Sequence, residues 1–363
     1  MKTGLVTFHA AHHYGAMLQA AALAKTVASI TGGCEVIDYV RPDNVEASAV
    51  FQKGLSRSAL IKNAHTVLHY KAFRRRWGRF DAFMRDTMRI EGIRYSTINE
   101  LTAQPPEHDT LLCGSDQIWN PELFIEKRFD PAFFLAFSNA RKVAYAPSFG
   151  SAKSVNEEEL RGYLQTFSHL SVREATGADI IRNAAGRDAP VVLDPTLLLE
   201  AGEWGAIAGD CTVKQPCLLC YFVSAPGHLT PLIRSVKSRL GVKAVQLAGT
   251  RRRARGADKL VFDAGPREFL ALFQNAAFVL TNSFHGAVFS ILFERPFICG
   301  AGGGEGVASR TGNLLATLGL TGRLIAGGGL PETLETDYAP VNERLRAERD
   351  RSLEYLRNAL IGE

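Results

Sequence analysis

The stretch Ala277–Phe293, AFVLTNSFHGAVFSILF, carries the pattern from which the fold of this chain can be predicted. The apolar run 277–280 has the length of a buried strand, and the polar residues Thr281-Asn282-Ser283 end it. From Phe284 onward, apolar residues continue over a length that suits a packed helix. A strand, a polar loop and a helix in this order form the repeating unit of a parallel α/β sheet. The polar middle also argues against a membrane span, although 269–293 is the longest run without Asp, Glu, Lys or Arg.

The same alternation recurs in both halves of the chain. In the first half, the pattern predicts strands over Gly4–Phe8, Cys34–Tyr39, Thr110–Cys113, Lys142–Ala146, His169–Val172 and Val191–Leu193, and helices over Gly15–Ile30 and Ser58–Arg89. In the second half, it predicts strands over Leu218–Val223, Ala244–Leu247, Leu260–Phe262, Ala277–Leu280 and Pro296–Cys299, and helices over Leu229–Leu240 and from Pro266 and Phe284. Two such patterns predict an α/β protein with two Rossmann-type domains.

A stretch of Gly, Ala and polar residues, 197–213, separates the two patterns and indicates a domain boundary. We expect an N-terminal Rossmann-like domain over 1–200, a C-terminal one over 201–335, and a charged amphipathic helix within 336–363. The two parallel sheets are expected to face each other across a cleft that the last helix closes. In such sheets, ligands bind beyond the carboxyl ends of the strands, where helix N-termini point at them.

The composition of the 363 residues excludes several classes of protein. Lys and Arg total 42 against 37 Asp and Glu, so no protein-wide basic field indicates nucleic acid as a partner. Six scattered cysteines favour reduced thiols of a cytoplasmic protein over a disulfide scaffold. The start, MKTGLVTFHAAHH, has too short an apolar run for a signal peptide, and its histidines match no standard zinc spacing, so we expect no metal. Neither a Walker A sequence nor a GxSxG motif is present.

Two polar motifs follow predicted strands of the first half. The loop 7–15 leads into a helix and is either a ligand-facing loop or an ordinary surface loop; its candidate ligand contacts are His12, His13 and Tyr14. The segment 113–121, CGSDQIWNP, offers side chains that suit hydrogen bonds to sugar hydroxyls: Ser115, Asp116 and Gln117. Asp116 could also accept a proton. The alternative is a Gly-Ser turn in which Asp116 caps a helix.

Two further motifs place polar residues at predicted helix starts. Ser171-Val172-Arg173-Glu174 has the spacing of a capping box, which puts Arg173 in the first helical turn, where its guanidinium could meet an anion. In 281–286, Asn282 or Ser283 can cap the next helix, and His285 falls in its first turn. The helix dipole attracts anions there, which suits a histidine that exchanges protons beside a phosphate. For Arg173 and His285 alike, a purely structural role is the alternative.

For the remaining motifs, a structural role is a simpler explanation than a functional one. Cys217 and Cys220 have CxxC spacing but lie within or beside an apolar strand, which favours core thiols over a metal or redox pair. Basic clusters at Arg74–Arg76 and Arg251–Arg255 are usual for solvated faces, with anionic lipid headgroups or a pyrophosphate as alternative partners. The Gly-rich segment 300–306 lacks the Rossmann spacing and is expected to be a loop.

Six segments occur in one order along the chain: Tyr14-Gly15 with Leu18-Gln19, then GSDQIWN (114–120), YAPSFG (145–150), SVRE (171–174), LDPTLLL (193–199) and TNSFHG (281–286). With these segments, the chain resembles the polysaccharide pyruvyl transferase family, and more closely its subgroup marked by the GSDQ-Trp-Asn signature. The resemblance covers nearly the whole chain.

The resemblance implies a GT-B-like architecture with the active site between an acceptor-side domain, 1–200, and a donor-side domain, 201–335. It implies transfer of pyruvyl from phosphoenolpyruvate to two hydroxyls of a sugar as a cyclic ketal, with release of phosphate and without a cofactor. Arg173 and His285 match an arginine and a histidine that act at the donor site of characterised members. Asp116 is a further candidate, as base or acceptor ligand, and Asn282 and Ser283 are expected beside the donor.

The chain departs from the family pattern at two places. Several members have an arginine shortly before the histidine, where this chain has Asn282-Ser283-Phe284, so we expect Arg310 or Arg295 to contact the donor anion instead. His12-His13 replaces the more usual Asn before Tyr14, so acceptor contacts in this loop are expected to differ.

A nucleotide-sugar glycosyltransferase of the same architecture is the main alternative, and a non-catalytic glycan-binding module is another. Because acceptors in the family are commonly built on polyprenyl-linked carriers, we expect a cytoplasmic protein that visits the inner face of the cytoplasmic membrane without spanning it. Arg74–Arg76 and Arg251–Arg253 would supply the attraction to anionic lipid.

Overall fold

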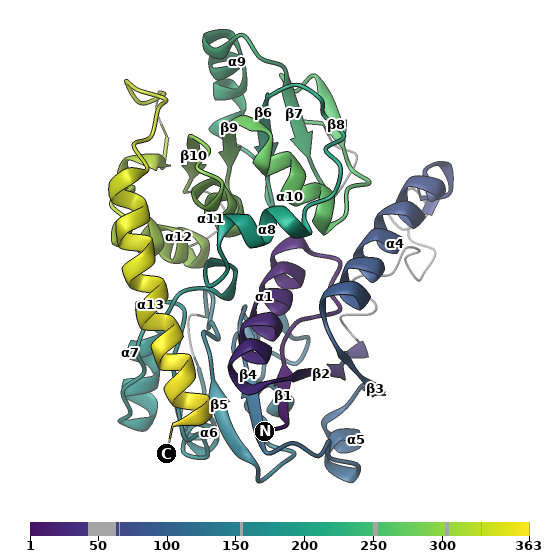
Figure 1. Ribbon diagram of the computed structural model, residues 1–363, viewed down its shortest axis with the longest axis vertical. Helices are drawn as coiled ribbons and strands as arrows, with labels where there is room; N and C mark the ends of the chain where they lie inside the picture. Colours follow the sequence, from purple (N-terminus) through teal and green to yellow (C-terminus); the bar gives the residue numbers. More distant parts are fainter. Residues whose placement is uncertain are drawn as a thin grey trace. The chain divides into compact units, whose positions relative to one another are not determined.

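The computed structural model describes residues 1–42, 63–64, 66–152, 155–249, 253–301, 305–327 and 329–362. The chain divides into two compact units: unit 1 comprises Met1–Leu198 and Ser352–Glu363, and unit 2 comprises Leu199–Arg351. Each unit is built on one parallel sheet with helices, so the predicted α/β class is confirmed (Figure 1).

Unit 1 contains a five-stranded sheet in the order β3-β2-β1-β4-β5, with every pair parallel. Its strands are β1 (Thr3–Val6), β2 (Cys34–Tyr39), β3 (Ile90–Tyr95), β4 (Thr110–Cys113) and β5 (Arg141–Ala144). Its helices are α1 (Tyr14–Thr31), α4 (Tyr70–Thr87), α5 (Ile98–Ala103), α6 (Glu157–Leu164) and α7 (Ala175–Ala185), and its 3-10 helices are η1 (Pro121–Leu123), η2 (Pro131–Phe134) and η3 (Pro195–Leu197). The strand order reverses between β1 and β4, and such a switch point leaves space for a ligand beyond the strand ends.

Helix α1 illustrates how local sequence determines an element of this sheet. Its alanine-rich sequence has high helix propensity, and thirteen of its eighteen residues are buried. The helix ends at Gly32, whose φ of 83° closes the last turn by a hydrogen bond to the Ala28 carbonyl. The predicted range, 15–30, therefore lies within the observed helix.

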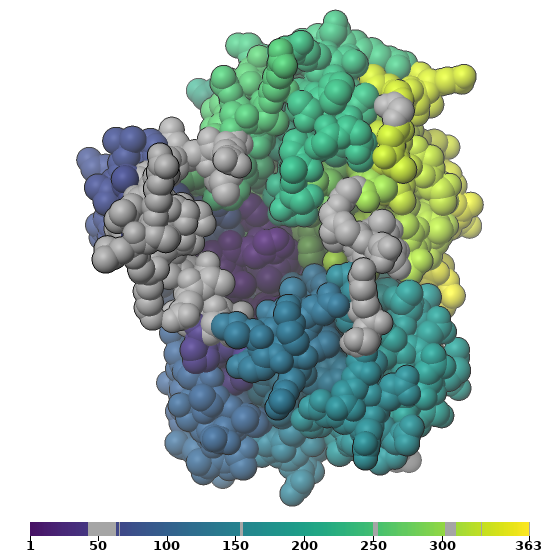
Figure 2. All heavy atoms as spheres, turned by 180° about the vertical axis from the view of Figure 1, so that it is seen from behind, coloured from purple at the N-terminus to yellow at the C-terminus, as the bar shows by residue number. Residues whose placement is uncertain are grey.

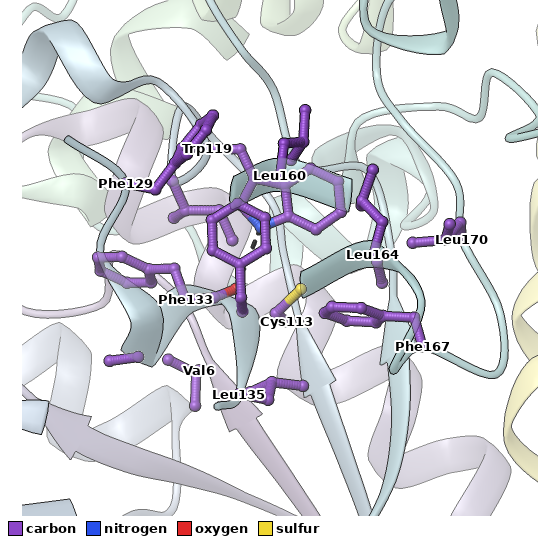
Figure 3. Close-up of a cluster of buried hydrophobic side chains, with 14 of the residues drawn as sticks. Val6, Cys113, Trp119, Phe129, Phe133, Leu135, Leu160, Leu164, Phe167 and Leu170 are labelled. Carbon is purple, nitrogen blue, oxygen red and sulfur yellow. Dashed lines mark hydrogen bonds between the residues drawn. The ribbon is translucent and has the colours of Figure 1, made fainter. Parts of the chain in front are cut away.

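The core of unit 1 is centred on aromatic side chains (Figure 3). Trp119 is completely buried, its Nε1 donates to the Phe133 carbonyl at 3.1 Å, and its ring stacks on Phe134 with 5.0 Å between centroids. Because Trp119 belongs to the GSDQIWN segment, this packing anchors the loop that carries Asp116.

Unit 2 contains a six-stranded parallel sheet in the order β11-β10-β9-β6-β7-β8. Its strands are β6 (Cys217–Tyr221), β7 (Ala244–Leu247), β8 (Lys259–Val261), β9 (Ala276–Thr281), β10 (Phe297–Gly300) and β11 (Leu324–Ile325). Its helices are α8 (Ala201–Ile207), α9 (Leu229–Leu240), α10 (Pro266–Gln274), α11 (Phe284–Leu292) and α12 (Glu305–Thr317), with the 3-10 helix η4 (Thr321–Arg323); the last helix, α13 (Ala339–Ile361), begins in this unit. Among the described residues, no helix combines the length and apolar character that crossing a membrane requires.

The last helix, α13, is shared by the two units rather than forming a segment of its own. Residues up to Arg351 belong to unit 2, and residues from Ser352 onward belong to unit 1. Within unit 1, the Tyr355 hydroxyl donates to the Ala144 carbonyl at 3.1 Å at the end of β5. The sequence pattern 336–363 therefore predicts a helix but not its division between two units.

Three strand predictions need correction. The predicted helix 58–89 leads into the strand β3. The pattern missed this edge strand because only its last residue is buried, so it shows no buried face. The strands predicted over 169–172 and 191–193 are wrong, because only single bridges form there, Val143 with His169 and Val172 with Val191. Residues 58–62 of the predicted helix lie outside the described residues.

Candidate functional site

Arg173 is the centre of a buried cluster of charged side chains in unit 1. Its Nη1 donates to Asp194 Oδ2 at 2.5 Å, and its Nη2 lies 3.5 Å from Asp116 Oδ1. Burial by itself would lower the pKa of Arg173, but the negative charges of Asp194 and Asp116 outweigh it and raise the pKa. Arg173 is therefore a stable cation that connects two carboxylates from different loops.

The predicted capping box at Ser171–Glu174 is wrong. Helix α7 begins at Ala175, and the Glu174 side chain makes no cap; its Oε1 accepts from the Phe149 backbone N–H at 3.0 Å. Ser171 Oγ bonds two backbone groups at the end of β5. Both side chains hold the loop after β5, so Arg173 precedes the helix instead of lying in its first turn.

The loop after β4 brings Asp116 to Arg173. Gly114 has a φ of 135°, and a Cβ at this position would lie 1.8 Å from the Tyr145 carbonyl oxygen. Only glycine fits this close approach of two backbones. The Asp116 side chain accepts from the Gln117 N–H at 2.9 Å and is 15% exposed. The next helix, η1, is capped by Asn120, so Asp116 is not a helix cap. Because its side chain is partly exposed, Asp116 remains accessible to a ligand.

Ser115 supports this loop from inside. It is completely buried; its Oγ donates to the Ala146 carbonyl at 2.9 Å, and its N–H donates to Gln19 Oε1 at 3.2 Å. Gln19 Nε2 also donates to Thr7 Oγ1 at 3.0 Å. Gln19 thus joins the loops after β1 and β4, a role signalled by one polar residue in an otherwise apolar stretch of α1. Gln117, the other predicted acceptor contact in this loop, is half-buried and accepts from Asn120.

The three predicted acceptor residues of the first loop have different surroundings. The His12 ring stacks on Trp77 of α4, with 5.8 Å between centroids, and its Nε2 lies 3.3 Å from Asp81 Oδ1. Tyr14 is buried, and the Arg76 guanidinium lies 5.3 Å from its ring centroid. His12 and Tyr14 therefore dock α4 against α1, and His13 is the exposed residue of the three.

In unit 2, the predicted polar junction lies between β9 and α11. Ser283 caps α11 by accepting from the Gly286 N–H at 3.3 Å, so the predicted cap is confirmed. Asn282 Oδ1 accepts from the Val223 N–H at 2.9 Å and thereby ties the carboxyl ends of β9 and β6 together. His285 is the second residue of α11 and is 6% exposed, so its predicted place in the first helical turn is confirmed.

Comparison with known proteins decides the family. The sequence model of the polysaccharide pyruvyl transferase family matches residues 13–300. The chain belongs to this family. The match includes both polar clusters, the one around Arg173 and the one around His285. No curated protein matches the chain significantly.

One of the similar solved structures supports the GT-B-like fold of this pyruvyl transferase family member. The UDP-GlcNAc 2-epimerase of Neisseria meningitidis bound to UDP-GlcNAc is similar over 99% of this chain and 94% of its own, with a TM-score of 0.53 and 9% identity. The ADP-heptose lps heptosyltransferase II of E. coli is similar over 98% and 99%, with a TM-score of 0.41 and 11% identity. At such identities, the likeness concerns the fold alone.

The two arginines expected at the donor site lie in different places in unit 2. Arg295 follows the C-terminal end of α11, and its carbonyl accepts from the Tyr338 hydroxyl at 2.6 Å. This is the end of α11 opposite to His285, so the structure does not bring Arg295 to the His285 junction. Arg310 is buried in α12, the helix that follows β10. Arg310 is therefore the better placed of the two, because it follows the carboxyl end of a strand adjacent to β9.

The two cysteines with CxxC spacing lie in a buried strand of unit 2. Cys217 and Cys220 are both buried in β6, and burial raises the pKa of Cys217 to about 11. No group of three or more His, Cys, Asp and Glu side chains among the described residues is arranged to hold a metal ion. The CxxC spacing here belongs to a core strand.

Proposed function

We propose that this family member transfers pyruvyl from phosphoenolpyruvate to two hydroxyls of a sugar in a polysaccharide precursor, forming a cyclic ketal and releasing phosphate. The family match supports a pyruvyl transferase. The single observation that carries the proposal is the His285 junction, where a buried histidine stands in the first turn of a capped helix beyond a strand end. This is the position at which α/β proteins bind anions.

The reaction requires a proton donor, a proton acceptor and charge stabilisation. Protonation of the methylene carbon of the donor gives an oxocarbenium-like carbon, which one sugar hydroxyl attacks as it loses its proton. Phosphate then leaves, and a second hydroxyl of the sugar attacks the same carbon, gives its proton to the acceptor base and closes the ketal. We assign the proton transfers to His285 and the stabilisation of donor charge to Arg173, because a histidine suits both directions of transfer and a guanidinium suits carboxylate and phosphate.

Asp116 is assigned to the acceptor. Its carboxylate is 15% exposed, whereas the guanidinium and carboxylate beneath it are almost completely buried. A partly exposed carboxylate on a loop fixed by Trp119 and Ser115 can accept a hydrogen bond from a sugar hydroxyl. No cofactor is part of this proposal, and the acceptor is a free sugar or a polyprenyl-linked oligosaccharide.

Isothermal titration tests the donor. Phosphoenolpyruvate is expected to bind, and UDP- and ADP-linked sugars are expected not to bind. Incubation of the protein with phosphoenolpyruvate and lipid-linked oligosaccharides is expected to add a pyruvyl ketal, seen by mass spectrometry. Binding of a nucleotide sugar without phosphoenolpyruvate would replace this proposal by a glycosyltransferase, and binding of an oligosaccharide alone would replace it by a glycan-binding module.

Replacing Arg173 by Lys is expected to weaken phosphoenolpyruvate binding although the positive charge is kept. The guanidinium contacts Asp194 through Nη1 and Asp116 through Nη2, whereas the single nitrogen of an ammonium group cannot reach both carboxylates in this way. The loss of one charge-assisted hydrogen bond corresponds to about a ten-fold weaker affinity. Titration at matched thermal stability checks this prediction, and an unchanged affinity would leave Arg173 with a structural role only.

We also propose a cytoplasmic protein that contacts an anionic membrane surface through α4. The expected Arg74–Arg76 cluster needs correction, because Arg76 is buried against Tyr14 and Phe80. At the start of α4, the basic Lys71, Arg74 and Arg75 are exposed, and the apolar Val67 and Leu68 just before the helix are 65% and 75% exposed. Figure 2 shows this part of the chain in dark blue at the surface. Basic and apolar side chains together are typical of surfaces that bind anionic lipid. Arg251 and Arg252 of the second cluster lie outside the described residues.

Co-sedimentation with vesicles that contain phosphatidylglycerol tests this surface. The wild-type protein is expected to pellet at low salt and to be released at high salt, because exposed charges are screened. Replacing both Lys71 and Arg74 by Glu is expected to abolish pelleting, since each basic residue contributes about 1 kcal/mol. The control replaces the exposed Arg346 and Arg357 of α13 by Glu, which changes the net charge equally and is expected to preserve binding. Equal pelleting of both variants would refute the assignment to α4.

A further inference from the structure

Asp194 belongs to the charged cluster of unit 1 but is out of reach of any substrate. Its side chain is 0% exposed. Oδ2 accepts from Arg173 Nη1 at 2.5 Å, and Oδ1 accepts from the backbone N–H and the hydroxyl of Thr196 at 3.0 and 2.6 Å. Because both oxygens accept hydrogen bonds inside the protein, Asp194 acts on the reaction only through its neighbours.

The backbone around Asp194 is held from both sides. The Tyr145 hydroxyl donates to the Leu193 carbonyl at 3.0 Å, and the Leu193 N–H donates to Ser352 Oγ in α13 at 3.0 Å. Tyr145 is itself completely buried, and burial together with the nearby charge of Asp194 raises its pKa well above the usual range, so it remains a neutral donor. Asp194 therefore presents its carboxylate from a fixed backbone.

The two arms of Arg173 are held unequally. The contact from Nη1 to Asp194 is 2.5 Å long and completely buried, whereas the contact from Nη2 to Asp116 is 3.5 Å long and ends on a side chain that is 15% exposed. A distance of 3.5 Å is at the long limit of a hydrogen bond, so the arm toward Asp116 is the one that a ligand oxygen can take over. The arm toward Asp194 is closed to ligands.

We propose that Asp194 is a positioning residue that fixes Nη1 of Arg173, so that Nη2 can exchange Asp116 for an oxygen of the bound donor. This inference rests on the proposed function and adds an order of events to it. When Nη2 turns to the carboxylate or phosphate of the donor, the Asp116 carboxylate loses one donor and becomes available to a hydroxyl of the acceptor. Donor binding thus prepares the acceptor contact, and the donor binds first.

Two substitutions that remove one negative charge each are expected to act in opposite directions. Asp194→Asn frees the fixed arm and is expected to weaken phosphoenolpyruvate binding by about ten-fold or more, as measured by isothermal titration. Asp116→Asn removes the carboxylate that competes with the donor for Nη2, so it is expected to bind phosphoenolpyruvate at least as tightly as the wild type while the KM for the acceptor rises. A merely structural role of Asp194 would lower thermal stability and leave donor affinity unchanged, which would overturn the proposal.

Two further measurements keep the test independent of folding and of the proposed function. Thr196→Val keeps the Asp194 charge and removes one hydrogen bond to it, and it is expected to weaken donor binding less than Asp194→Asn does. If wild-type protein does not bind phosphoenolpyruvate, the proposed function fails, and crystal structures of the unliganded variants still test the positioning role. Arg173 is expected to leave its place in Asp194→Asn and to keep it in Asp116→Asn; an unmoved guanidinium in Asp194→Asn would overturn the proposal.

Discussion

Replacing His285 by Ala is expected to lower turnover about 100- to 10,000-fold, the range that a general acid or base contributes. The residue stands in the first turn of α11, whose cap comes from Ser283, and its side chain makes no part of that cap. The substitution therefore removes the proposed proton carrier and leaves the helix start in place. Turnover of a lipid-linked acceptor with phosphoenolpyruvate, followed by release of phosphate, measures the effect.

Ser290→Ala in the same helix is the matched control for this experiment. Ser290 Oγ donates to the Gly286 carbonyl inside α11, and the side chain is completely buried. The control is expected to keep turnover close to that of the wild type, because only a hydrogen bond within the helix is lost. If His285→Ala keeps turnover within a few-fold of the wild type at equal thermal stability, His285 has no part in the mechanism.

Replacing Gly114 by Ala is expected to destabilise unit 1 by about 2–6 kcal/mol, the sum of backbone strain and overpacking. The added Cβ would lie 1.8 Å from the Tyr145 carbonyl oxygen, and the φ of 135° favours glycine. Both residues are buried directly after β4 and β5, and their N–H groups donate to the Val6 and Cys113 carbonyls, so neither backbone can move away cheaply. The melting temperature is expected to fall by about 5–20 °C, as measured by calorimetry.

Gly78→Ala is the matched control within unit 1, and it is expected to raise stability instead of lowering it. Gly78 lies inside α4, and no atom lies within 4 Å of a Cβ added there. Alanine in a helix interior is more favourable than glycine by about 1 kcal/mol, so this variant is expected to be slightly more stable than the wild type. A Gly114→Ala protein with wild-type stability would show that the loop after β4 tolerates a different backbone path and is not rigid.

The place of His285 at a helix start could be predicted because the interactions that set it are local. Ser283 caps the helix by a hydrogen bond to Gly286, three positions away. The apolar runs on either side determine where β9 ends and α11 begins. A short segment therefore contains all the information needed to place His285 at a helix start.

The charged cluster around Arg173 could not be predicted in the same way. The partners of its guanidinium are 21 and 57 positions away in the sequence, and the segment SVRE by itself favours a capping box that does not form. Glu174 satisfies the backbone of Phe149 instead, because the loop after β5 packs against the start of α7. In the sequence, Asp194 is only one residue of the LDPTLLL segment, and its role follows from its contact with Arg173.

The basic run Arg74–Arg76 also combines a feature visible in the sequence with one that only packing decides. The sequence shows three adjacent cations, and only the packing of α4 on α1 separates the buried Arg76, over the Tyr14 ring, from its exposed neighbours. Residues that follow one another on a helix point in different directions, so one of three is turned inward.

The sequence by itself determined the α/β class, the order of most strands and helices, the two patterns of alternation and the place of His285, because apolar periodicity and helix caps act over a few residues. Tertiary structure alone decided which side chains meet. It paired Arg173 with Asp194 and Asp116, and it buried Tyr14 and Ser115. Such contacts depend on how separate loops converge at the strand ends, and the free energy that selects them comes from burial and charge pairing between distant segments.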